Sequence, residues 1–80
     1  MNTIHIRYYA ILREQSGKSE ETLTTGAATA AALFDELKSR YPFSLEASQL
    51  KVAINTEFRD WQTPLASGDK VVFIPPVAGG

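Results

Sequence analysis

The sequence predicts an α+β domain in which one main helix packs across one face of a mixed sheet. Three observations carry this prediction: alternating residues near the N-terminus, a helical stripe in the middle and an apolar run near the C-terminus. The chain has 80 residues, of which 44% are hydrophobic, so it can bury one thin core but not two. We expect a domain over residues 1–74 and a flexible C-terminal tail over residues 75–80.

The first two strands are expected over residues 3–9 and 20–25. In the first, the residues alternate between faces, with Ile4, Ile6 and Tyr8 on one side and His5, Arg7 and Tyr9 on the other. The second is rich in Thr, which favours strands, and follows a turn at residues 16–19. The two strands would form a hairpin with a long loop over residues 10–19.

The main helix is expected over residues 27–41. Its apolar stripe consists of Ala30, Leu33, Phe34, Leu37 and Tyr41. Thr29 or Thr25 can cap its N-terminus, because a threonine hydroxyl accepts a hydrogen bond from a free amide of the first turn. Pro42 ends the helix, since proline disfavours helical backbone at the residue before it.

The remaining segments predict three further strands. A surface loop over residues 42–49 precedes a strand over residues 50–54, a turn, and a short returning strand over residues 58–61. A tight turn at Gly68 and Asp69 then leads into residues 70–74, whose apolar run is typical of a central strand. Pro75 and Pro76 end it, because proline cannot donate to a strand ladder.

This order of elements predicts how the sheet is connected. Right-handed crossovers make the first and last strands parallel neighbours in the simplest packing. The resulting arrangement is the β-grasp, or ubiquitin-like, fold.

Composition excludes several classes of function. Eight basic and nine acidic residues give a net charge of −1 without a charged run, so we expect neither a nucleic-acid nor a membrane partner. The absence of cysteine excludes disulfides and thiolate chemistry, and a single histidine makes a metal site unexpected. We see no signal peptide and no apolar run near the ~20 residues of a membrane span, and therefore expect a cytoplasmic protein.

Three short motifs carry little chemistry. Gly17, Lys18 and Ser19 resemble the end of a phosphate-binding loop, but the earlier glycine of that motif is replaced by Leu12, so we interpret them as a turn. His5 has no nucleophile or orienting acid at a suggestive spacing and is expected to face solvent. Trp61 is expected to close one end of the core.

Tyr9, Phe58, Val72 and Ile74 are predicted to bind a partner. They should lie on the sheet face that the helix leaves open, where soluble monomers seldom leave an apolar patch without a partner. The alternative, weighed about evenly, is that they tuck beneath the long loops.

The most chemical feature is the ending, Gly79-Gly80. Two residues without side chains form a thin strand that can enter a channel and present the terminal carboxylate. On a β-grasp domain with a proline lead-in, this is the ending of ubiquitin-like modifiers and sulfur carriers, although a double glycine alone could be a frayed terminus.

The chain as a whole resembles one family, the small subunit of molybdopterin synthase, which is a sulfur carrier. The resemblance lies in residues 8–14 (YYAILRE) followed by Gly17, in the turn over residues 65–69, and in residues 72–80 (VFIPPVAGG). The Ala-rich stretch at residues 27–32 departs from the more polar helix start common in the family, without affecting a functional residue.

The resemblance implies that the chain donates sulfur rather than catalyses by itself. An E1-like adenylyltransferase would use ATP to adenylate Gly80, and a sulfurtransferase would supply the sulfur that converts it to a thiocarboxylate. Val77, Ala78 and Gly79 would thread this end into the large synthase subunit, in a heterotetramer of two small and two large subunits. There the sulfur would pass to cyclic pyranopterin monophosphate to make molybdopterin, with the catalytic residues in the large subunit and no cofactor bound permanently to this chain.

Three alternatives remain open at this point. A thiamine-pathway sulfur carrier shares the fold and the ending but is typically shorter. A ubiquitin-like modifier would join Gly80 to lysines of other proteins, and a plain interaction module would use only the apolar face.

Overall fold

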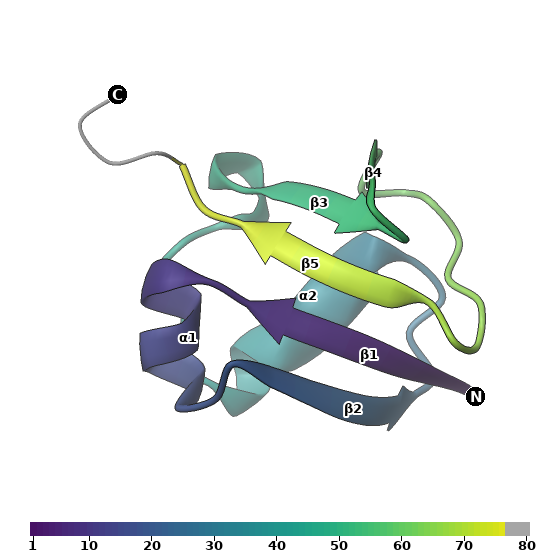
Figure 1. The fold of residues 1–80 in the computed structure, drawn as a ribbon, viewed down its shortest axis with the longest axis horizontal. Coiled ribbons are helices and arrows are strands. Elements are labelled where there is room, and N and C mark those ends of the chain that lie inside the picture. The colour runs from purple at the N-terminus through teal and green to yellow at the C-terminus, as the bar shows by residue number, and fades with distance from the viewer. Residues whose placement is uncertain (77–80) are drawn as a thin grey trace.

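The structure, a computed structural model, describes residues 1–76 and contains one five-stranded sheet (Figure 1). The strands are β1 (Asn2–Tyr8), β2 (Glu20–Thr25), β3 (Lys51–Ile54), β4 (Glu57–Arg59) and β5 (Lys70–Ile74). Their order across the sheet is β2-β1-β5-β3-β4, with β1 parallel to β5 and the other neighbours antiparallel. The predicted β-grasp, with its first and last strands parallel and the last one central, is confirmed.

The helix α2 (Ala30–Arg40) lies across one face of this sheet (Figure 1). The hydroxyl of Thr29 accepts a hydrogen bond from the amide of Ala32 at 3.2 Å, so Thr29 is the N-cap. Thr25 instead donates to Glu36 at 2.6 Å. Between α2 and the sheet lies the core, whose largest fully buried side chains include Ile4, Ile6, Tyr8, Leu33, Phe34, Leu37, Val71 and Phe73.

Aromatic rings close one end of this core. The Trp61 ring stacks on Phe73 with 5.8 Å between centroids, which confirms its predicted structural role. Phe43 stacks on Phe34 at 5.9 Å and is buried, so the expectation of a surface loop over residues 42–49 is wrong at this position. That loop also contains a short 3-10 helix, η1 (Ala47–Gln49).

The expected long loop over residues 10–19 contains a second helix, α1 (Ala10–Ser16). It was not predicted because Tyr9 provides no side-chain cap and the first turn holds no acidic residue, so the usual start signals are missing. Leu12 is fully buried and holds the helix against the core. Gly17, in left-handed conformation with φ of 78°, ends the helix by donating its amide to the carbonyl of Arg13 at 3.0 Å.

Several boundaries also differ from expectation. The main helix starts at Ala30 instead of residue 27, because Ala28 and Thr29 run extended beside Pro64 and Leu65. The returning strand covers Glu57–Arg59 instead of residues 58–61, because the chain turns at Asp60 to place Trp61 against the core.

The turn between β3 and β4 has an unusual backbone. Asn55 and Thr56 have φ of 52° and 71°, the left-handed pair of a two-residue hairpin turn. Asn55 also ties this turn to β5, because its amide donates to the carbonyl of Lys70 at 2.8 Å and its side-chain oxygen accepts from the amide of Lys70 at 3.0 Å.

None of the helices within residues 1–76 combines the length and apolar character needed to cross a lipid bilayer.

Candidate functional site

The predicted chemical residues Gly80 and Gly79, with the predicted threading residues Ala78 and Val77, lie outside the described residues. The structure follows β5 to Ile74 and the chain to Pro76. The site is therefore built from the sheet that leads to this end.

No helix within residues 1–76 covers the sheet face opposite α2, and we call this face the open face (Figure 1). On β1 and β5, Ile4, Ile6, Tyr8, Val71 and Phe73 point into the core, so the residues between them point away from it. The open face consists of Thr3, His5 and Arg7 of β1 with the following Tyr9, Glu20, Thr22 and Thr24 of β2, Lys70, Val72 and Ile74 of β5, Lys51 and Ala53 of β3, and Phe58 of β4.

Strand register aligns the apolar residues of the open face. Val72 lies opposite Ala53, and Ala53 lies opposite Phe58, so the three form one row across the sheet. Ala53 is 8% exposed yet does not belong to the core cluster, as expected for a small residue between two larger ones on the other face. At the end of the parallel pair, Tyr8 lies opposite Phe73, so Tyr9 and Ile74 follow at adjacent positions.

All four residues predicted to bind a partner lie on this face. The Phe58 side chain is 69% exposed and that of Tyr9 44%, whereas Val72 and Ile74 are half-buried and do not pack on the core. The loops therefore do not cover Tyr9 or Phe58. That the face binds a partner stays a prediction.

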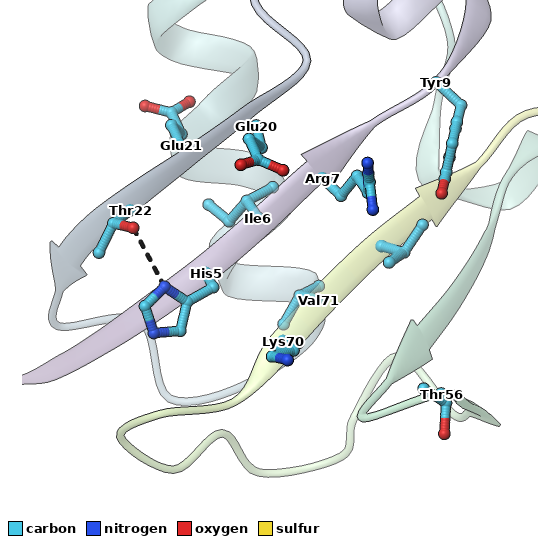
Figure 2. A pocket seen from close by; sticks show the side chains of 11 residues that line it. His5, Ile6, Arg7, Tyr9, Glu20, Glu21, Thr22, Thr56, Lys70 and Val71 are labelled. Atoms are coloured by element: carbon cyan, nitrogen blue, oxygen red, sulfur yellow. Dashed lines mark hydrogen bonds between the residues drawn. The ribbon is translucent and has the colours of Figure 1, made fainter.

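Beside the apolar row, the open face has a shallow groove between β2, β1 and β5 (Figure 2). His5 lies at one end, and its Nδ1 is 3.0 Å from the Thr22 hydroxyl. Arg7 lies further along, with its guanidinium carbon 5.8 Å from the centre of the Tyr9 ring. Figure 2 shows Arg7 between Tyr9 and His5 on the same side of the sheet. Alternation within each strand places His5, Arg7 and Lys70 on this face, but only the strand order and register show that Arg7, Lys70 and Lys51 lie on neighbouring strands.

The motifs set aside in the sequence have structural roles. Gly17 caps α1, and the Lys18 ammonium lies 3.7 Å from a Glu21 oxygen. Within residues 1–76, no three His, Cys, Asp or Glu side chains gather in a way that could hold a metal ion.

A polar cluster on the other side of the sheet was missed by sequence reasoning. One oxygen of Glu21 accepts hydrogen bonds from the hydroxyls of Tyr8 at 2.5 Å and Tyr41 at 2.7 Å. Burial and the bond to Glu21 raise the pKa of Tyr8 above its ordinary value. The only signal in the sequence was that Glu21 falls on the same face as Leu23 in a strand.

The ionised form of Glu21 is favoured. Partial burial pushes the pKa of Glu21 upward, but the hydrogen bonds from Tyr8 and Tyr41 and the charges of Lys18 and Arg40 outweigh burial and hold it below its usual value. The pKa of Lys18 is raised in turn, by Tyr41 and by Glu21. The cluster joins β1, β2 and the end of α2.

Comparison with known proteins decides what kind of chain presents this face and this ending. A model of the ThiS family matches residues 6–80, which covers the end of β1, all of β2 to β5 and the terminal glycines. The chain belongs to the ThiS family.

Curated relatives show which members of the ThiS family this chain is similar to. The molybdopterin synthase sulfur carrier subunit of Escherichia coli is 31% identical over 80 residues, covering 96% of this chain and 99% of the relative. The subunit of the same name from Mycobacterium tuberculosis is 31% identical over 83 residues and covers both chains completely. Among ThiS-family proteins, this chain is thus similar along its whole length to molybdopterin synthase sulfur carrier subunits, which confirms the resemblance found in the sequence.

Solved structures share the fold. The putative molybdopterin converting factor subunit 1 of Pyrococcus furiosus superposes with a TM-score of 0.79 at 24% identity, covering 96% of this chain and all of that one. Small archaeal modifier protein 1 of Haloferax volcanii gives a TM-score of 0.80 at 20% identity, with the same coverage. The complex of subunits 1 and 2 of the molybdopterin-converting factor of Helicobacter pylori gives 0.70 at 20%, covering 98% of this chain and 99% of that one. At these identities, the structures support the fold alone.

Proposed function

We propose that this chain is the sulfur carrier of a molybdopterin synthase and that the carboxyl group of Gly80 is its reactive group. The observation that carries the proposal is the match to sulfur carrier subunits along the full chain, including the terminal glycines. The fold agrees with it, because β5 is the central strand and runs directly into Pro75 and Pro76, which precede the last four residues.

The chemistry follows from what a carboxylate cannot do. A carboxylate is a poor electrophile and has no good leaving group, so it must be activated before sulfur can be attached. In the proposed sequence, an E1-like adenylyltransferase uses ATP to form the Gly80 acyl-adenylate and releases pyrophosphate. The persulfide of a sulfurtransferase displaces AMP to give an acyl disulfide, and a thiol reductant then cleaves its S–S bond to leave the thiocarboxylate. The thiocarboxylate then donates sulfur to cyclic pyranopterin monophosphate.

We further propose that the open face docks on the large synthase subunit and on the activating enzyme. The apolar row of Ala53, Phe58 and Val72, continued by Ile74 and Tyr9, supports this, because Phe58 and Tyr9 are exposed on it and Ile74 ends the strand that leads into Pro75. The Helicobacter pylori complex is described as one of subunits 1 and 2, which fits a two-subunit assembly. We take that assembly to be a cytoplasmic heterotetramer.

Phe58→Glu tests the docking face without endangering the core. Phe58 is 69% exposed, so the variant should fold, yet a carboxylate in a desolvated contact should weaken binding of the large subunit by roughly 2–5 kcal/mol. Ile74→Glu should act in the same direction. Ala32→Glu is the matched control, because Ala32 is exposed on α2 on the opposite side of the molecule. Unchanged affinity of a folded Phe58→Glu and a folded Ile74→Glu chain would show that the docking face lies elsewhere.

A reconstituted reaction separates the proposed function from its alternatives. The carrier loaded with sulfur, mixed with the large subunit and cyclic pyranopterin monophosphate, should yield molybdopterin. A thiamine-pathway carrier would form the thiocarboxylate but no molybdopterin. A modifier would instead appear as conjugates with lysines of other proteins, an outcome that the shared fold with a small archaeal modifier protein makes necessary to check.

A further inference from the structure

The charges of the open face are distributed differently from those of the rest of the chain. Arg7, Lys51 and Lys70 are exposed there, and Glu20 is the one carboxylate among the residues that define the face. The chain as a whole has a net charge of −1. The open face is therefore cationic on a slightly acidic protein.

The ion pairs also differ between the open face and the rest of the protein. Within residues 1–76, Lys18, Lys38, Arg40 and Arg59 each lie within 4 Å of a carboxylate, and all four lie off the open face. Arg7, Lys51 and Lys70 form no ion pair with any described residue, although Arg7 lies opposite Glu20 in the strand register. Among the described residues off the open face, every cation except Arg13 of α1 therefore lies beside a carboxylate, whereas all three cations of the open face lack an ion pair.

The cations surround the apolar contact. Arg7 is aligned with Val72 in the parallel pair, and Lys51 is opposite Ile74 at the far end of β5. Lys70 lies two residues before Val72 on β5, so its side chain is on the same face of the sheet. Figure 2 shows Lys70 next to Val71 near the start of this strand. An apolar centre with a charged rim is the anatomy of a protein interface.

We infer that the open face selects a protein partner whose contact surface presents carboxylates around an apolar centre. This inference rests on the proposed docking function and adds the chemistry of the partner surface. Uncompensated rim charges act mainly on encounter, because they raise the association rate in a salt-dependent way and disfavour partners of like charge. Three cations around an aliphatic and aromatic centre fit a protein better than a phosphate backbone, which requires many more phosphate contacts for tight binding.

The test is the association rate of the full chain with the large synthase subunit, followed at several salt concentrations. The rate should fall about tenfold or more between roughly 0.05 and 0.5 M salt, because screening removes the attraction between rim charges. Arg7→Glu and Lys70→Glu should each lower the low-salt rate by about tenfold, and Glu20→Lys should raise it.

Arg13→Glu is the control for these variants. Arg13 is also exposed and without an ion pair within residues 1–76, but it lies on α1, off the open face. The substitution changes the net charge by the same amount, so only the position of the charge differs. Its association rate should stay within about twofold of the wild type, since an exposed charge off the interface is largely screened.

Each result has one meaning. Association that is independent of salt and equal for Arg7→Glu and Arg13→Glu would overturn the inference and leave the proposed function intact. A wild-type chain that does not bind the large subunit at all would overturn both. Binding to a single-stranded RNA or to phosphatidylserine vesicles at physiological salt, lost in Arg7→Glu while the large subunit binds unchanged, would also overturn the inference and assign the cations to a different class of partner.

Discussion

Glu21 shows how a single residue can fix the junction between three elements. Its carboxylate accepts from Tyr8 of β1 and from Tyr41 at the end of α2, while Glu21 itself is on β2. Hydrogen bonds to a charged acceptor are stronger than those between neutral groups. Replacing the charge should therefore loosen the packing of α2 on the edge of the sheet.

Glu21→Gln should lower the free energy of unfolding by about 1–2 kcal/mol at neutral pH, because the amide oxygen can still accept but carries no charge. The pH dependence has a definite sign. The pKa of Glu21 is lowered in the folded chain, so its contribution is present above the ordinary glutamate range and is lost as the pH falls through the lowered value. Denaturant unfolding of the variant and wild type at several pH values measures this.

Glu14→Gln serves as the control, because Glu14 is exposed on α1 and its side chain forms no hydrogen bond or ion pair with any residue from 1 to 76. The difference between wild type and Glu21→Gln should shrink in acid, whereas Glu14→Gln should differ little at any pH. Equal stability of all three chains at neutral pH would contradict the role given to Glu21.

At the scale of elements, the β3–β4 turn has a strained backbone at Thr56. Thr56 has φ of 71°, a conformation that β-branched residues rarely adopt. Thr56→Gly should raise the free energy of unfolding by about 0.5–1 kcal/mol, since Asn-Gly is the favoured pair for this turn. Thermal unfolding of the exposed-turn variant would reveal it, and a lower melting temperature would show that the backbone is not strained there.

The helix α2 is expected to stabilise the core and to take no direct part in sulfur transfer. Leu37 is fully buried beneath it, so Leu37→Ala should lower the free energy of unfolding by about 2–5 kcal/mol. Sulfur transfer by this variant should decline only as far as its folded fraction declines, measured by circular dichroism under assay conditions. A fully folded variant with a specific transfer defect would assign α2 a direct role.

The elements that sequence patterns predicted well are those with a strong period. Alternation in β1, the helical stripe of α2 and the apolar run of β5 each correspond to an observed element, and Thr29 caps α2 as expected. The sequence does not predict the short helix α1, because seven residues without an N-cap show too little helical periodicity. Gly17, which can end a helix in left-handed conformation, is the one signal for it in the sequence. The expectation of a surface loop fails at Phe43, because no local pattern shows that an isolated aromatic residue returns to a distant core.

For the whole molecule, the sequence could predict which apolar residues share the open face but not which charges surround them. Placing Tyr9, Phe58, Val72 and Ile74 required only strand alternation and the position of one helix. Joining Arg7 to Lys51 and Lys70 required the strand order β1-β5-β3 and its register, which arise from pairing between distant segments. The Glu21 cluster was missed for the same reason, because Tyr8 and Tyr41 meet it only in three dimensions.

The central claim is that Gly80 carries the chemistry through its own carboxyl group. Gly79→Val adds a branched side chain where a narrow channel is expected, so it should impair sulfur loading or transfer while the chain stays folded and bound. Removing Gly80 withdraws the reactive group by one residue, or ~3.5 Å of extended chain, from the adenylation centre. Folding should be unaffected, because the residue follows the last strand and Pro76.

The most direct measurement is the intact mass of the chain after incubation with the activating enzyme, ATP and a sulfur source. We predict that the wild-type chain gains the mass difference between one sulfur and one oxygen atom, and that the chain lacking Gly80 gains nothing. Complete thiocarboxylate formation on the shortened chain, or none on the wild type under conditions that load an established carrier, would contradict the assignment of Gly80 as the sulfur-bearing residue.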